Sequence, residues 1–132
     1  MAKGSNSVDA ATADRLAEDV NKGNNLDIVL DLHTQNLANA KRLVKKQLKL
    51  VKERLDNGLL DRKLIKGDDG LKNNYIFYIS CGAGRHSDGK AVLKNTIPGF
   101  VQRTLGYESY LQDASGVVLV HMKKKEVEIL IK

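Results

Sequence analysis

The chain has 132 residues, with 22 lysines and arginines against 16 aspartates and glutamates, a formal net charge of +6, one cysteine and no tryptophan. With 42% hydrophobic and 29% charged residues, its composition suits one globular domain and excludes a membrane protein or a disordered polyelectrolyte. The first ten residues lack the apolar segment of a signal peptide, and Cys81 alone cannot form an internal disulfide. We therefore expect a monomer without a membrane partner, in a reducing compartment such as the cytoplasm or nucleus.

The first half of the chain predicts a helix, a strand and a second helix. Small apolar residues at helical spacing predict a short helix over 8–20, within an N-terminal region of residues 1–25 that precedes the main domain. Residues 26–32 are rich in Leu, Ile and Val and predict a strand. Apolar residues three and four positions apart predict a helix over 37–55, which Asn57-Gly58 would end.

The second half predicts further strands around one more helical region. A polar loop over 59–74 precedes a strand over 75–80, and a helical stretch over 88–105 is interrupted at Pro98-Gly99 by a kink or a new helix start. Strands over 107–111 and 117–122 form a predicted hairpin, and 126–131, in a basic extension over 123–132, suggests an added edge strand. The alternation of strands and helices predicts an α/β fold with a sheet covered by helices, in the order α-β-α-β-α-β-β(-β).

The helix predicted over 37–55 contains the densest cluster of positive charge. Between residues 41 and 54 it has seven lysines and arginines against one glutamate, a net charge equal to that of the whole chain. At about 100° per residue, most of them lie on the flank beside the apolar face. A solvated outer surface is one interpretation, and a surface that binds nucleic-acid phosphates is the other. The candidate phosphate-binding residues are Lys41, Arg42, Lys45, Lys46, Lys49 and Lys52.

Two short segments hold the candidate functional side chains, and each follows a predicted strand. In the first, Asp31 and His33 are two residues apart and so lie on the same side of an extended chain, where a carboxylate can orient an imidazole for general-base catalysis. The alternative is a polar pair at a helix start. The second is rich in glycine, which lets backbone N–H groups approach an anion. Its candidate residues are Gly82, Ala83, Gly84, Arg85, His86, Ser87 and Lys90.

A nucleotide-binding P-loop does not explain the glycine-rich segment. Residues 84–90 match G-x-x-x-x-G-K, but Ala91 replaces the Ser or Thr that would hold Mg²⁺. Ligands of open α/β sheets bind at the carboxyl ends of strands. If the two strands are parallel neighbours, both segments therefore share one crevice, with a carboxylate, two imidazoles, a guanidinium and backbone N–H groups suited to phosphodiester chemistry.

Together the two segments resemble the motifs of the small MutS-related (Smr) domain family. Residues 30–33 match its L-D-L-H-G motif, residues 82–87 match its G-x-G-x-H-S motif, and the likeness extends over 26–122. Thr34 stands in place of the motif glycine, Cys81 in place of a Thr or His, and Ala83 where active members often have Lys or Arg. The resemblance implies a two-layer α/β sandwich similar to the C-terminal domain of translation initiation factor three. It also implies nucleic-acid binding and, in several members, endonuclease or nicking activity on DNA or RNA.

These observations favour an endonuclease with RNA preferred over DNA, and the resemblance implies messenger-RNA or ribosome quality control as its setting. His33, held by Asp31, would act as base, Arg85 would stabilise the developing charge, and His86 would act as acid. No cofactor is predicted. A divalent cation near Asp31 and His33 stays an alternative, for which two candidate ligands are too few to argue. Ala83 favours the alternative of a non-catalytic adaptor that binds RNA or the ribosome, and a third interpretation is binding to an acidic protein.

Overall fold

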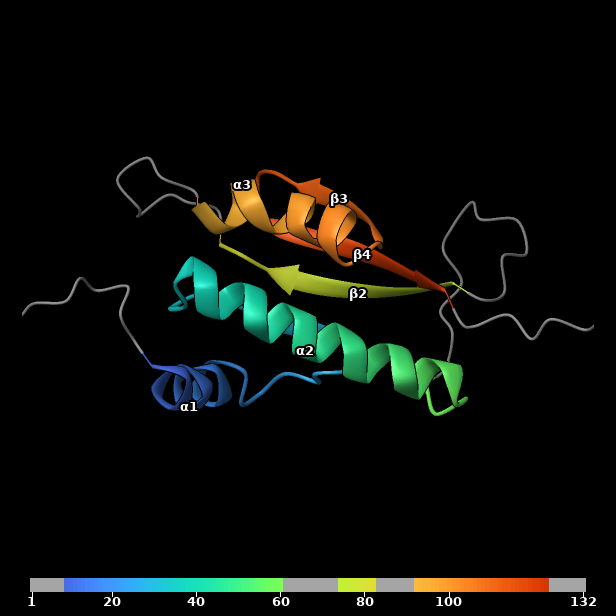
Figure 1. Cartoon of the computed structure of the whole chain (residues 1–132), viewed down its shortest axis with the longest axis horizontal. Helices are drawn as coiled ribbons and strands as arrows, with labels where there is room; N and C mark the ends of the chain where they lie inside the picture. Colours follow the sequence, from blue (N-terminus) through green and yellow to red (C-terminus); the bar gives the residue numbers. More distant parts are fainter. Residues whose placement is uncertain (1–8, 61–73, 83–91, 124–132) are drawn as a thin grey trace, which may run out of the picture.

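Figure 1 shows the computed structural model of the chain, which describes residues 9–60, 74–82 and 92–123. These residues form a mixed α/β fold, as predicted. Their elements, in chain order, are the helix α1 (Ala10–Val20), the strand β1 (Val29–Asp31), the helix α2 (Leu37–Asp56), the strand β2 (Asn74–Ser80), the helix α3 (Val92–Gly99), the π-helical segment η1 (Phe100–Thr104), and the strands β3 (Glu108–Gln112) and β4 (Val117–Lys123). Most of the predicted loop over 59–74, the start of the predicted 88–105 helix, and the added strand over 126–131 lie outside the described residues.

The described strands form one mixed sheet in the order β1-β2-β4-β3. β1 and β2 are parallel and are connected through α2, whereas β4 is antiparallel to both β2 and β3. In the parallel pair Asp31 lies opposite Ser80, so both strands end at the same level. The sheet therefore brings the residues that follow β1 and those that follow β2 to one edge.

The hydrophobic core lies between the sheet and the helices that cover one of its faces. α2 and α3, with η1 continuing α3, lie on the same side of the sheet (Figure 1). The apolar face predicted for α2 points into this core, and Asn57 and Gly58 end the helix as predicted. The largest fully buried side chains are Phe77, Leu32, Leu48, Leu55, Ile79, Ile97, Met122, Val44, Val51, Val101, Val118 and Val120.

The strand predicted over 26–32 is shorter in the structure, where β1 begins at Val29. Asn25 explains the difference, because its backbone carbonyl accepts hydrogen bonds from the N–H groups of Ile28 and Val29. Its side chain also accepts a hydrogen bond from the N–H of Asp27. These bonds hold the preceding residues in a turn, as Asn side chains commonly do.

At the interruption predicted for Pro98-Gly99, α3 ends at Gly99 and a helix of a different type, η1, begins at Phe100. Pro98 lies in the last turn of α3, and η1 follows directly from Phe100. Proline lacks the N–H that the α-helical pattern requires. In the π-helical pattern each N–H donates to the carbonyl five residues earlier, and not four as in an α-helix. The N–H of Leu105 accordingly donates to the carbonyl of Phe100 at 3.1 Å. No helix in the described ranges is both long and apolar enough to span a bilayer.

Candidate functional site

Asp31 and His33 form a directly contacting pair at the end of β1. Asp31 Oδ1 accepts a hydrogen bond from the His33 backbone N–H at 3.0 Å and lies 3.1 Å from the ring Nδ1. A proton shared at Nδ1 favours the tautomer in which Nε2 is free to accept a proton. The His33 side chain is 61% exposed, against 27% for Asp31. A carboxylate thus orients an accessible imidazole, the arrangement that a general base requires.

The segment after β2 begins beside this pair. The N–H of Leu32 donates to the carbonyl of Ser80 at 2.8 Å, so Cys81 and Gly82 follow β2 at the same end of the sheet as Leu32 and His33. Gly82 has a φ of 82°, in the left-handed region that favours glycine, and a Cβ at this position would meet no atom within 4 Å. Gly82 is therefore required for its backbone conformation and not for close packing.

The other residues predicted for the second segment lie outside the described ranges 74–82 and 92–123. They are Ala83, Gly84, Arg85, His86, Ser87 and Lys90. Asp31, His33 and Gly82 are thus placed at one edge of the sheet, whereas the guanidinium and the second imidazole remain sequence predictions.

Cys81 lies in the core beside the candidate site. Burial, with a smaller contribution from the Asp31 carboxylate, raises the pKa of the Cys81 thiol to about 12. The thiolate is the reactive form of cysteine, and it is negligibly populated near neutral pH at such a pKa. We therefore exclude Cys81 as a nucleophile.

A cavity of about 470 Å³ lies between the first turns of α2 and α3, close to His33 in the chain. Its lining residues are Gln35, Asn36, Leu37, Ala38, Val92 and Leu93. The Asn36 side chain caps α2 by accepting a hydrogen bond from the Asn39 N–H at 2.9 Å. The partial positive charge at this end of a long helix favours an anionic group nearby. The cavity thus lies beside the partly positive first turn of α2.

The basic residues of α2 divide into groups by what they contact. On one side of the helix, Arg42 pairs with Asp14 of α1 at 2.9 Å and Arg54 pairs with Asp27 at 3.0 Å. Lys46 is exposed and has no carboxylate partner among the described residues. Arg42 was predicted to bind phosphate, but its guanidinium already contacts a carboxylate from a distant part of the chain.

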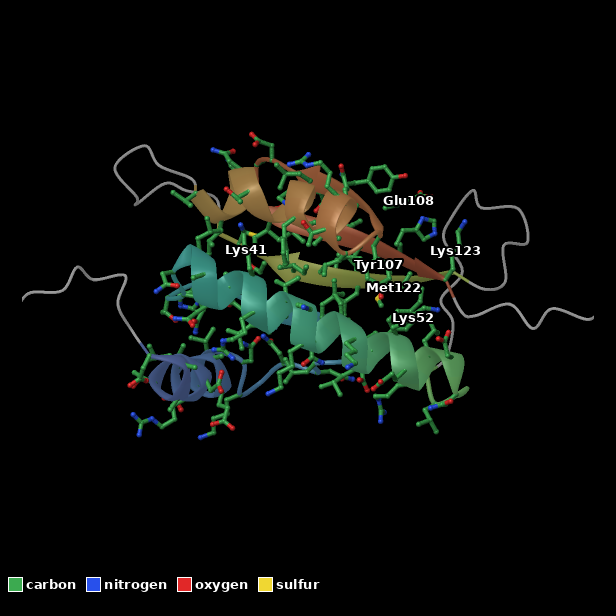
Figure 2. The ribbon with its side chains drawn as sticks, viewed as in Figure 1. Lys41, Lys52, Tyr107, Glu108, Met122 and Lys123 are labelled. Carbon is green, nitrogen blue, oxygen red and sulfur yellow. The ribbon has the colours of Figure 1, made fainter. Side chains whose placement is uncertain are left out.

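The remaining lysines form what we call the basic flank of α2, namely Lys41, Lys45, Lys49 and Lys52. Figure 2 shows Lys41 and Lys52 on the side of α2 that faces α3 and η1. The Lys41 ammonium lies 5.5 Å from the centre of the Phe100 ring. Lys52 Nζ contacts Asp56 at 2.7 Å and donates to the Lys123 carbonyl at 2.8 Å. Lys45 and Lys49 are exposed and form no ion pair with a described carboxylate, so they are the members of the flank most available to a ligand.

The basic flank and the Asp31–His33 pair do not share one surface. Leu30 and Leu32 are buried under the helices, and alternation along a strand therefore directs Asp31 to the opposite side of the sheet. The flank lies on the helical side. A nucleic acid that contacts both must therefore pass from one face of the sheet to the other, around the end of β1 and near the start of α2.

Asn21 is a site residue that the sequence analysis missed. Its Nδ2 group donates to the carbonyls of Ala17 at 2.9 Å and Asp31 at 3.0 Å. Its Oδ1 atom accepts from the N–H of Asp31 at 2.7 Å and from Asn24 Nδ2 at 2.9 Å. All four hydrogen-bonding positions of the amide are used. The buried Asn21 side chain thus joins α1 to the outer edge of β1 and fixes the backbone of Asp31.

Thr34 adopts a φ of 80°, the only positive value among the described residues other than glycine. A β-branched residue in this region is strained by about 1–3 kcal/mol. Because Thr34 is exposed, we expect Thr34→Gly to stabilise the protein by about 1 kcal/mol after the higher entropy of unfolded glycine is subtracted. Urea unfolding would measure this. Thr34→Ala retains a Cβ and should give a smaller gain, and equal effects of both substitutions would contradict the strain argument.

Within the described ranges, no three histidine, cysteine, aspartate or glutamate side chains lie close enough together to hold a metal ion. Comparisons of the chain with protein-family models, curated proteins and solved structures gave no match. The resemblance to the Smr family accordingly rests on the two sequence motifs.

Proposed function

We propose that this protein is a nucleic-acid-binding domain of the Smr type that cleaves phosphodiester bonds as an endonuclease, with RNA favoured over DNA. The proposal includes a two-layer α/β sandwich similar to the C-terminal domain of translation initiation factor three. The observation that supports it most is the position of the Asp31–His33 pair, which lies at the same sheet edge as Gly82, beside the end of a parallel strand.

In the proposed reaction, His33 Nε2 removes the proton from a ribose 2′-hydroxyl, whose oxygen attacks the adjacent phosphorus. Asp31 holds the imidazole at Nδ1 and stabilises the charged ring. The backbone at Gly82 and the Arg85 guanidinium stabilise the extra negative charge on the phosphoryl oxygens. His86 donates a proton to the departing 5′-oxygen, so the products are a 2′,3′-cyclic phosphate and a free 5′-hydroxyl. With water as nucleophile, His33 would serve in the same way on DNA.

The basic flank supports the binding half of the proposal. Two lysines without a described partner, Lys45 and Lys49, lie one helical turn apart and can each contact a phosphate. Lys46 is also exposed and adds positive charge to the same helix. In the proposed setting, messenger-RNA or ribosome quality control in the cytoplasm or nucleus, the monomer would bind RNA alone or on the ribosome.

A non-catalytic adaptor that binds RNA or the ribosome is the second candidate function. One observation favours it besides Ala83 in the motif: the basic flank and the Asp31–His33 pair lie on different sides of the sheet. Binding at the flank therefore does not require a phosphate at His33.

A cleavage assay on matched single- and double-stranded RNA and DNA, with and without EDTA, separates the two functions. The endonuclease proposal predicts cleavage of RNA, with 2′,3′-cyclic ends, and much slower cleavage, through attack of water, when the ribose at the cut site lacks its 2′-hydroxyl. If EDTA abolishes cleavage, a metal ion is required, and water replaces the 2′-hydroxyl as the proposed nucleophile. Binding without cleavage of any substrate selects the adaptor, and the absence of binding to all four nucleic acids rejects both functions.

A further inference from the structure

A groove of about 240 Å³ lies between α2 and the segment that follows η1. Lys45, Lys49 and Lys52 of the basic flank line one side, and Leu105 and Tyr107 line the other. The remaining lining residues are Leu48, which is 1% exposed and so lies at the base of the groove, and Glu53. Figure 2 shows Tyr107 on the side of α2 to which Lys52 also projects. The groove thus combines a cationic wall with an apolar, aromatic wall.

The charges around the groove favour an anionic ligand. Three lysines line it against the single carboxylate of Glu53. Lys52 contacts Asp56, but Lys45 and Lys49 pair with no carboxylate in the described part of the chain. Lys45 and Lys49 are four residues apart, which separates them by about 6 Å along the helix axis. Neighbouring charges on an extended polyanion can therefore contact both lysines at once.

The wall opposite the lysines favours a flat ring over a purely charged partner. Tyr107 is half-buried, and burial followed by the nearby Asp56 carboxylate raises the pKa of its hydroxyl, so its ring remains a neutral phenol near neutral pH. Leu105 extends the apolar surface beside it. Aromatic side chains next to cationic ones are the usual means by which proteins bind unpaired nucleotides. The groove volume lies below the roughly 300–1,000 Å³ of sites for whole small molecules, which suits one base of a polymer.

We propose that this groove binds one unpaired nucleotide of a single strand, with its base against Tyr107 and Leu105 and its flanking phosphates at Lys45 and Lys49. This proposal rests on the proposed function, which supplies nucleic acid as the class of ligand, but it does not depend on cleavage. A base within a duplex is stacked and paired and cannot enter the groove without being displaced. The groove therefore makes the protein selective for single strands or for unpaired positions in structured RNA.

Equilibrium binding to a fluorescent single-stranded 12-mer, measured by anisotropy with the full chain, tests the groove directly. We expect Lys45→Glu/Lys49→Glu to weaken binding at least about 30-fold and to lower the slope of log affinity against log salt by about 1.4. The matched control is Arg15→Glu/Lys22→Glu, which changes the net charge equally at two exposed basic residues outside α2 and outside the groove. We expect it to weaken binding only a few-fold. All four substituted residues are exposed, so the variants should fold.

The aromatic wall is tested separately with the same 12-mer and its duplex. Tyr107→Phe keeps the ring and should bind like the wild type, whereas Tyr107→Leu should weaken single-strand binding about 10-fold and leave the weaker duplex binding unchanged. Circular dichroism would check that each variant is folded. RNA and DNA 12-mers of one sequence show whether the ribose contributes, with similar affinities expected because neither wall is specific for a 2′-hydroxyl.

Two results would overturn the proposal that the groove binds a nucleotide, while leaving the proposed function intact. One is an equal loss of affinity in the two charge-reversal variants, and the other is equal affinity of the wild type for the single strand and the duplex. Displacement of the RNA by polyglutamate at lower concentrations than by unlabelled RNA would overturn it in favour of an acidic protein partner. If the groove variants behave as expected but no nucleic acid is ever cleaved, the groove is supported and the endonuclease proposal fails.

Discussion

His33→Ala is expected to reduce the rate of RNA cleavage by about 10²–10⁴-fold, the usual contribution of a general base. The substitution removes the imidazole whose Nδ1 contacts Asp31 and whose Nε2 would accept the proton. RNA affinity should change less than about two-fold, because the basic flank lies on the other side of the sheet and phosphate contacts dominate affinity. Single-turnover cleavage rates and anisotropy with the same RNA would measure the two effects.

Variants of Asp31 test whether the carboxylate acts through the ring. Asp31→Asn retains an oxygen that can accept the His33 N–H but removes the charge that stabilises a protonated imidazole. We expect a smaller loss than for His33→Ala, about 10–10²-fold, and no further loss when both substitutions are combined. His121→Ala is the matched control, because this histidine lies on β4 and contacts Glu108. Cleavage that persists unchanged in His33→Ala would remove this pair from the mechanism.

The parts of the fold that could be predicted are those determined by local pattern. The helix α2 was predicted almost to the residue, because its apolar positions repeat over five turns and Asn57-Gly58 supplies a stop signal. The late start of β1 was missed, since it depends on hydrogen bonds that Asn25 makes to three following residues. The change to a π-helix after Pro98 was also missed, because sequence patterns indicate where proline disturbs a helix but not how the chain compensates.

The predictions for the candidate site follow the same rule, because local contacts could be predicted and contacts with distant parts of the chain could not. The contact between Asp31 and His33 is local, and the sequence placed both side chains on one side of an extended chain. In the structure β1 ends at Asp31 and His33 lies in the turn that follows, where its N–H donates to the Asp31 carboxylate. That Gly82 follows β2 at the same end of the sheet as this pair required the further assumption that the two strands are parallel neighbours. The pairing of Arg42 with Asp14, 28 residues away, could not be predicted because nothing in the helix pattern identifies the partner. The sequence therefore identified a basic helix. It could not show which of its basic residues pair with carboxylates and which are available to a ligand.

Asn21→Ala is expected to lower the free energy of unfolding by about 2–4 kcal/mol, an unusually large effect for one polar side chain. The substitution removes all four hydrogen bonds of the amide and leaves the Asp31 N–H and carbonyl without their partners. Asn24→Ala is the matched control, because it removes only the bond between the two asparagines and should cost less than about 1 kcal/mol. Urea unfolding monitored by circular dichroism would measure both variants.

The same substitution tests whether α1 supports the candidate site as well as the fold. Asn21 holds the backbone of Asp31, and Asp31 in turn orients His33. Assayed well below its unfolding midpoint, folded Asn21→Ala should therefore cleave RNA about 10-fold more slowly than the wild type, since small errors in position are costly in catalysis. Its affinity for RNA should stay the same, because the lysines of the basic flank are unaffected. A stable Asn21→Ala protein, or an equally destabilised Asn24→Ala protein, would show that α1 is held to β1 by other contacts.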